Sequence, residues 1–143
     1  MKENFFPRSP YDEVHGLVYF GRLLDKIRLH VAGELPEAYI ANLGNAQKFD
    51  GSCLRFLGVS YHDLEKVVVA GATDEETWEW CVKNGKSHTE EEVIIWSGYM
   101  TKCGWRDNMT EALQSRLKAI SKEDRADIQT FFEYLDLDEG RKN

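Results

Sequence analysis

Apolar residues recur along the chain at intervals of three and four, which is the spacing of one buried helix face. These stripes predict helices at residues 17–32, 51–57, 61–70, 74–84, 93–103, 109–120 and 128–135. Two runs rich in Val and Ile, 67–69 and 93–95, have the composition of strands. Both lie between helix-capping and helix-ending residues, so we predict helix there as well.

Helix boundaries are marked at regular intervals. A hydroxyl residue followed three positions later by an acid predicts an N-cap. This signature occurs at Ser9, Ser60, Thr73, Thr89 and Ser121. Glycines that can end a helix in the left-handed conformation stand at Gly33, Gly58, Gly71, Gly85 and Gly104. Between these marks, residues 33–50 carry little pattern, and we expect a loop with a short turn of helix.

The prediction is therefore an all-α fold, a compact bundle of six or seven helices. Its 143 residues match the usual size of one domain, and we expect residues 1–143 to form a single unit. The polar segment 136–143 is expected to be a frayed tail.

Charge and cysteine usage narrow the function classes. The formal net charge is −7, which disfavours nucleic acid and anionic membranes as partners. The predicted helix pair 61–70 and 74–84 could resemble a DNA-reading unit, but its second helix opens on three acids that would meet phosphates. No apolar run is long enough for a signal peptide or a membrane span. Three widely spaced cysteines suit a reducing compartment, so we expect a cytoplasmic protein.

Motifs of catalysis are missing from the sequence. No cysteine–histidine set has zinc spacing, and no phosphate-binding loop, dinucleotide fingerprint or nucleophile elbow occurs. We therefore expect no metal and no cofactor, and an enzyme is disfavoured without being excluded. Trp80 lies on the far side of the stripe formed by its helix. It must find a second surface, which is either another helix of the chain or the interface with a partner protein.

The N-terminal segment holds the most suggestive polar residues. Asp25 precedes Arg28 by three positions, so the two can pair along one helix, and His30 falls at the other border of the apolar stripe. Together with Arg8, these residues form either a structural ion-pair cluster or a pocket for a small anion. Guanidinium groups suit the second role, because they bind carboxylate or phosphate with two hydrogen bonds.

An ordered series of motifs resembles a bacterial protein family that is catalogued only as a domain of unknown function. The motifs include Pro-Arg-Ser-Pro-Tyr-Asp-Glu-Val (7–14), Leu-Asp-Lys-Ile-Arg-Leu-His (24–30), Thr-Asp-Glu-Glu (73–76), Gly-Trp-Arg-Asp (104–107) and Asp-Ile-Gln-Thr-Phe-Phe (127–132). The resemblance covers nearly the whole chain and implies one small cytoplasmic domain. It departs from the family pattern at His15, where that pattern has glycine. No catalytic residue follows from it.

Two function classes remain open at this point. The first is a non-catalytic binding or interaction module with a protein partner. The second is a small-anion or metabolite-binding protein, or a minor enzyme, that uses the cluster of Arg8, Asp25, Arg28 and His30. Nucleic-acid binding ranks last. The sequence does not decide the oligomeric state.

Overall fold

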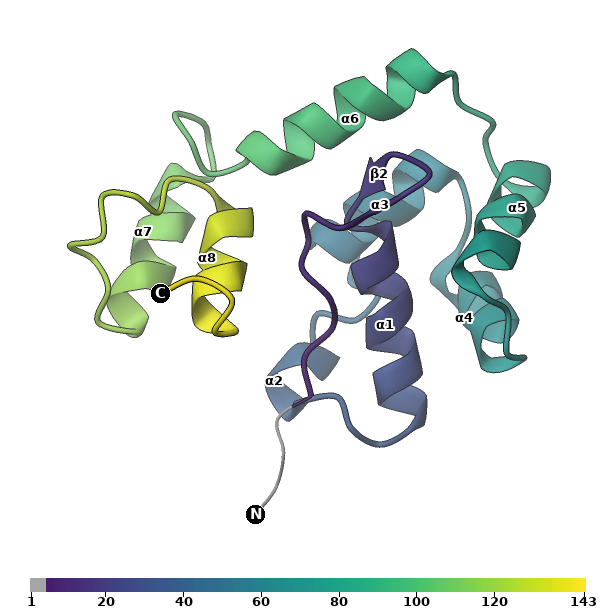
Figure 1. The fold of residues 1–143 in the computed structure, drawn as a ribbon, viewed down its shortest axis with the longest axis horizontal. Helices are drawn as coiled ribbons and strands as arrows, with labels where there is room; N and C mark the ends of the chain where they lie inside the picture. Colours follow the sequence, from purple (N-terminus) through teal and green to yellow (C-terminus); the bar gives the residue numbers. More distant parts are fainter. Residues whose placement is uncertain (1–4) are drawn as a thin grey trace.

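Helix α1 (Phe20–Val31) runs through the centre of the molecule, and the other elements gather around it (Figure 1). The structure is a computed structural model that describes residues 5–143, so the first four residues of the predicted domain lie outside it. The surrounding elements are β1 (Glu13–Val14), β2 (Leu17–Val18), α2 (Glu37–Ile40), α3 (Phe49–Leu57), α4 (Tyr61–Val69), α5 (Asp74–Asn84), α6 (Glu90–Lys102), α7 (Thr110–Ala119) and α8 (Phe131–Asp138). The all-α prediction is confirmed, but residues 5–143 contain eight helices where six or seven were expected, together with one two-stranded hairpin.

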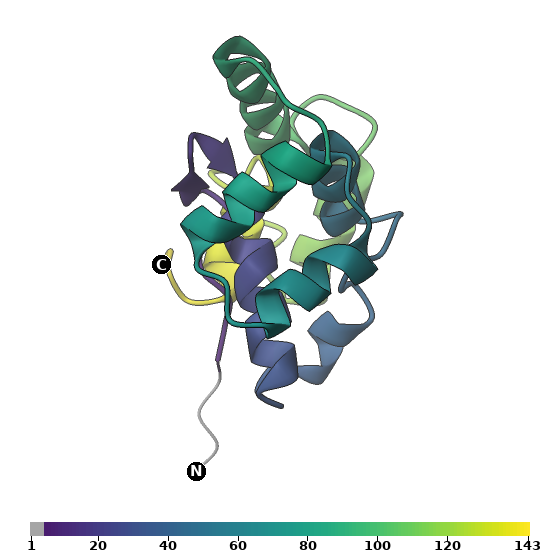
Figure 2. The same cartoon turned by 90° about the vertical axis from the view of Figure 1, so that its right-hand side faces the viewer.

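Two apolar clusters form the core. The larger one is centred on the hairpin and α1, where Leu17, Phe20 and Leu24 have no exposed surface. The smaller one joins Leu113 and Leu117 of α7 to Tyr134 of α8 and to Ile128, which precedes α8. Helix α6 runs along the top of the molecule from α5 to the α7–α8 pair (Figure 1), and Figure 2 shows the same helix at the outer edge.

Local capping signals predicted three of the helix starts correctly. The side chains of Ser60, Thr73 and Thr89 each accept a hydrogen bond from the backbone N–H three residues later. Thr73 and Thr89 form complete capping boxes, as expected for sequences with glutamate at the third helical position. The two valine-rich and isoleucine-rich runs are helical in α4 and α6, as predicted. Residues 33–50 contain the four-residue helix α2, which matches the expected short turn.

Two of the predicted caps are wrong. Ser9 does not begin a helix, because its hydroxyl accepts from the N–H of Tyr11 in a turn that leads into the hairpin. Ser121 follows α7 with a positive φ of 58°, and no helix starts there. Both residues use their side chains or backbone in turns, a common competing role for serine.

The predicted helix over 17–32 begins later than expected. Leu17 and Val18 belong to β2, where Val18 pairs with Glu13 and Leu17 pairs with Val14. The two residues between the strands, His15 and Gly16, have φ values of 52° and 80°. Such a two-residue turn closes a hairpin when both positions tolerate positive φ. The first apolar residues of the predicted helix, Leu17 and Val18, therefore form a strand instead.

The C-terminal segment is more ordered than the expected frayed tail. Helix α8 begins at Phe131, after the cap Thr130, and reaches Asp138. Glu139 follows with only 8% of its surface exposed. The reason is a set of long-range polar contacts that a sequence pattern does not reveal, and these contacts belong to the candidate site.

Candidate functional site

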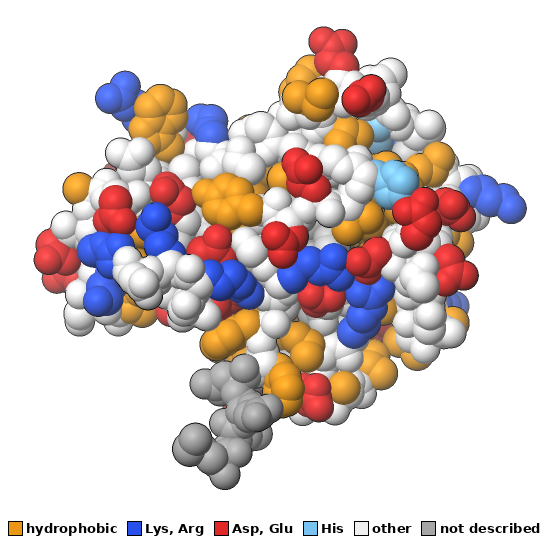
Figure 3. All heavy atoms as spheres, viewed as in Figure 1, with side chains coloured by type: hydrophobic (Ala, Val, Ile, Leu, Met, Phe, Trp, Pro, Cys, Tyr) orange, Lys and Arg blue, Asp and Glu red, His pale blue; other side chains and the backbone are white. Residues whose placement is uncertain are grey.

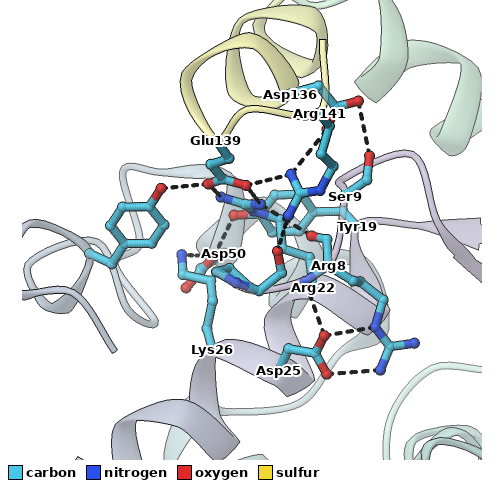
Figure 4. Close-up of polar contacts among 12 residues, drawn as sticks. Arg8, Ser9, Tyr19, Arg22, Asp25, Lys26, Asp50, Asp136, Glu139 and Arg141 are labelled. Atoms are coloured by element: carbon cyan, nitrogen blue, oxygen red, sulfur yellow. Dashed lines mark hydrogen bonds and ion pairs between the residues drawn. The ribbon is translucent and has the colours of Figure 1, made fainter. Parts of the chain in front are cut away.

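The sequence-predicted residues Arg8, Asp25 and Arg28 do come together. Arg8 binds both carboxylate oxygens of Asp25, with Nε–Oδ2 and Nη2–Oδ1 distances of 3.0 and 2.9 Å (Figure 4). Its backbone N–H also donates to Asp25. Arg28 lies one helical turn beyond Asp25, at 3.3 Å from Oδ1. The i, i+3 pairing within α1 is as the spacing indicated.

A fourth residue, which the sequence analysis missed, completes this cluster. Asp74, at the start of α5, lies 2.8 Å from a guanidinium nitrogen of Arg8 and 2.8 Å from one of Arg28. Burial alone would raise the pKa of Asp74, but the hydrogen bonds and charges of the two arginines outweigh it and lower that pKa. Two positive and two negative groups therefore balance within the cluster.

Gly21 makes room for this arrangement on α1. A Cβ atom built at that position would lie 2.7 Å from a guanidinium nitrogen of Arg8. His30 stands apart from the cluster, exposed in the last turn of α1. The structure thus joins three of the four predicted residues into one half-exposed cluster and leaves His30 outside it. Figure 3 shows that basic side chains on this face lie next to acidic ones.

A second, buried polar network lies deeper on α1. Arg22 donates two hydrogen bonds to Glu139, at 2.8 and 2.6 Å, and a third to the backbone carbonyl of Arg8 (Figure 4). Glu139 also accepts from Tyr39 and from Arg141. Burial disfavours the Glu139 carboxylate, but the hydrogen bonds and charge of Arg22 prevail, so its pKa is lowered. The C-terminal segment is thereby attached to the central helix.

One turn further along α1, Lys26 extends the buried network. Its Nζ atom lies 2.9 Å from Oδ1 of Asp50, and the hydroxyl of Tyr19 donates to the same oxygen at 2.6 Å. The other carboxylate oxygen accepts from the backbone N–H of Gly44 at 2.9 Å. Desolvation lowers the pKa of Lys26 although Asp50 opposes the shift. Asp50 has no exposed surface, so this pair is enclosed by the protein.

The contacts within the buried network hold parts of the fold together. Nearly every polar atom in it already has a partner, the exception being Nε of Arg22. Sequence reasoning missed Arg22 and Lys26, although their spacing of four places them on one face of α1. Their partners lie 117 and 24 positions away, beyond the reach of a local pattern.

The predicted interface residue Trp80 is half-buried and packs against the larger apolar cluster. The structure therefore gives it a surface within its own chain. Its use by a partner protein stays a prediction.

A shallow groove of about 390 Å³ opens between the hairpin turn and α6. His15 lines it, stacks on Trp78 at a ring distance of 5.2 Å, and contacts the carboxylate of Glu75. His88 also lines the groove, and its ring stacks on Phe56 at a centroid distance of 3.8 Å. Within residues 5–143, no group of His, Cys, Asp and Glu side chains is arranged to hold a metal ion. In the same residues, no helix has the length and apolar character to cross a membrane.

The most unusual surface of the molecule is on α6. Its inner side buries Val93, Ser97 and Met100, as a packed helix should. Its outer side is also apolar, with Ile94, Ile95 and Tyr99 exposed by 63%, 64% and 55%. At about 100° per residue, these side chains share one face with three further exposed residues. We call this the α6 outer face, made of Glu91, Ile94, Ile95, Gly98, Tyr99 and Lys102.

Comparison with known proteins places the chain in a family. A family model described as "Domain of unknown function (DUF5069)" matches residues 4–141. The match covers nearly the whole chain, so the chain belongs to this family, as the motif resemblance implied. A search of the curated proteins found no match.

Proposed function

We propose that this member of the DUF5069 family is a non-catalytic interaction module, which binds a protein partner through the α6 outer face. The observation that carries the proposal is the exposure of Ile94, Ile95 and Tyr99 on consecutive turns of one regular helix. A contiguous apolar surface of this kind on an otherwise well-packed protein marks an interaction site. Tyrosine and isoleucine supply apolar contact area at low cost in side-chain entropy.

The helix that carries this surface is fixed in place before any partner arrives. The hydroxyl of Ser97 accepts from the N–H of Val18 and donates to the carbonyl of Gly16, which fastens α6 to the hairpin. Trp96 stacks on Phe56 with a ring distance of 5.0 Å. A rigid surface loses little conformational entropy on binding, so more of its contact energy becomes affinity.

The alternative, a small-anion or metabolite site at Arg8 and Arg28, has less support. Each guanidinium group is engaged by Asp25 and by Asp74. An anion would have to displace a carboxylate that already matches it in charge and geometry. The same balance of charges, together with the formal net charge of −7, argues against nucleic acid and anionic membranes as partners.

We further propose that the protein works in the cytoplasm. Its three cysteines, Cys53, Cys81 and Cys103, are free and buried. Burial raises the pKa of the Cys81 thiol to about 12, so this thiol stays protonated and unreactive at neutral pH. Unpaired thiols of this kind suit a reducing compartment.

Photo-crosslinking in the native cells tests the interaction function. The photoreactive residue p-benzoylphenylalanine is placed at position 99 of the full chain, with position 114, an exposed site on α7, as the matched control. We expect a crosslinked adduct of defined mass from position 99 and none from position 114. Equal labelling at both positions, or no adduct at position 99, would refute the proposal.

A further inference from the structure

We infer that the partner of the α6 outer face is a second copy of the same chain, with the two α6 helices antiparallel. The inference rests on the proposed function, because it names the partner of that surface. The order of residue types along the α6 outer face points to this partner.

The outer face is complementary to itself when the helix is reversed. With the two-fold axis between Trp96 and Ser97, each outer-face residue meets its mirrored position on the other copy. The resulting pairs are Glu91 with Lys102, Ile94 with Tyr99, and Ile95 with Gly98. Because a two-fold axis repeats every contact, each pair forms twice. The two α6 helices thus make two ion pairs and four apolar contacts with each other.

Gly98 gives the clearest shape match. It lies in the middle of α6, yet a Cβ atom built there would meet nothing within 4 Å. A glycine in an exposed helix interior destabilises the helix relative to alanine, because it has more backbone freedom to lose on folding. In the antiparallel pair, the open space above Gly98 receives the side chain of Ile95 from the second copy. Glycine therefore allows the two helix axes to approach closely.

Charge determines the direction of the pair. The first turn of α6 carries Glu90, Glu91 and Glu92, and its last turn carries Lys102. Antiparallel packing brings opposite charges together and opposes the two helix dipoles favourably. Parallel packing would instead place Glu91 against Glu91 and would leave Gly98 facing Gly98. The three glutamates also disfavour an anionic membrane as the occupant of this face.

The size of the face sets the strength of the pair. Thirteen residues make a helix of about 20 Å, so the contact lies at the small end of specific interfaces. We therefore expect a dimer that forms in a concentration-dependent way in the micromolar range, in rapid exchange with monomer.

Sedimentation velocity over a range of concentrations tests the pairing. The wild-type chain should shift from monomer to dimer as its concentration rises. Ile95→Glu should raise the dissociation constant at least tenfold, because it places a carboxylate in the apolar space above Gly98. Val69→Glu, at a similarly exposed apolar position on α4, is the matched control and should leave the dissociation constant unchanged.

A charge-reversal mixture tests the antiparallel register. Glu91→Lys and Lys102→Glu should each weaken self-association, because each places like charges opposite one another twice. An equimolar mixture of the two variants should associate as wild type does, since the mixed dimer has one native ion pair and one with its signs exchanged. Lys102 also lies 3.2 Å from Asp107, so urea unfolding of each variant checks that the fold is intact.

Three outcomes would overturn the inference: a wild-type chain that stays monomeric, a dimer that withstands Ile95→Glu, or a mixture that associates no better than its components. The proposed function can be judged separately. A monomeric chain that still yields a crosslink from position 99 to a different protein would refute self-pairing and leave the interaction module in place. A monomeric chain with no crosslink would refute both.

Discussion

The contact between Arg22 and Glu139 allows a quantitative prediction. Glu139→Gln keeps the size of the side chain and removes its charge, so the guanidinium group of Arg22 stays buried beside a neutral amide. Arg22 is 2% exposed, and its Nε atom already lacks a partner. Breaking a buried pair in this way costs about 3–5 kcal/mol. At about 4 °C per kcal/mol for a chain of this length, Tm should fall by roughly 12–20 °C.

Urea unfolding followed by far-UV circular dichroism measures the loss directly. Asp127→Asn is the matched control, because Asp127 pairs with Arg125 at 2.9 Å on the exposed surface. Removing the charge of Asp127 should leave the free energy of unfolding nearly unchanged. A double variant, Arg22→Met with Glu139→Leu, should recover part of the lost stability, since a buried apolar pair replaces a buried ionic one.

The pH dependence of the same variant has a definite sign. The pKa of Glu139 is lower in the folded protein than its usual value of 4.5. Its contribution to stability is therefore present above pH 4.5 and is lost as pH falls through the folded-state pKa. Wild type should lose stability in acid more steeply than Glu139→Gln. A loss below about 1 kcal/mol at neutral pH, or identical acid profiles of wild type and variant, would show that the buried pair of Arg22 and Glu139 does not stabilise the fold in this way.

Three further predictions concern other parts of the fold. Arg28→Ala should lower Tm by only about 2–4 °C, because the cluster is partly exposed and Arg8 still holds Asp25 and Asp74; a drop like that of Glu139→Gln in a thermal melt would contradict this. Thiol titration should find three free cysteines in denaturant and slow reaction in the native state. Burial raises the pKa of Cys81 from 9.0 to about 12, so this thiol ionises at lower pH in the unfolded chain than in the folded protein. The urea midpoint should therefore fall as pH rises from 9 to 12. A urea midpoint that does not change over this range would contradict the prediction. Gly85→Ala should destabilise the fold by about 1–3 kcal/mol, since its Cβ would lie 2.2 Å from the carbonyl oxygen of Leu57. Gly98→Ala should instead stabilise the monomer by about 0.5–1 kcal/mol, because a Cβ there meets no other atom. A urea-unfolding experiment in which Gly98→Ala is the less stable of the two variants would refute the packing described.

Local chemistry explains why much of the fold could be predicted from the sequence. The capping boxes at Thr73 and Thr89 act within four residues, so the signal and the structure lie in the same short segment. The pairing of Asp25 with Arg28 is equally local. Gly58 takes the left-handed φ of 71° expected of a helix end, whereas Gly85, with φ of −111°, is required by its close approach to the backbone of Leu57.

The features that sequence reasoning missed depend on distant partners. The apolar run that starts at Leu17 suits a strand as well as a helix, and the turn at His15 and Gly16 places Leu17 and Val18 in a hairpin. Asp74 was recognised as a helix-opening acid, but its ion pairs with Arg8 and Arg28 exist only because α5 packs beside α1. The α6 outer face could not be recognised from the sequence for a similar reason. Ile94, Ile95 and Tyr99 are apolar, and only the structure shows that the core leaves them uncovered.

The attachment of Glu139 to Arg22 has a consequence for biosynthesis. The two residues are 117 positions apart, so α1 emerges from the ribosome long before the carboxylate that pairs with Arg22. Arg141 donates to the carbonyl of Pro7 and Ser9 donates to Asp136, which adds two more contacts between residues 7–9 and residues 136–141. Contacts of such long sequence separation form late, because loop closure must precede them. Until residues 136–141 dock on α1, the guanidinium group of Arg22 stays hydrated and lacks the carboxylate of Glu139. Docking of residues 136–141 is therefore expected to follow the folding of the core around α1.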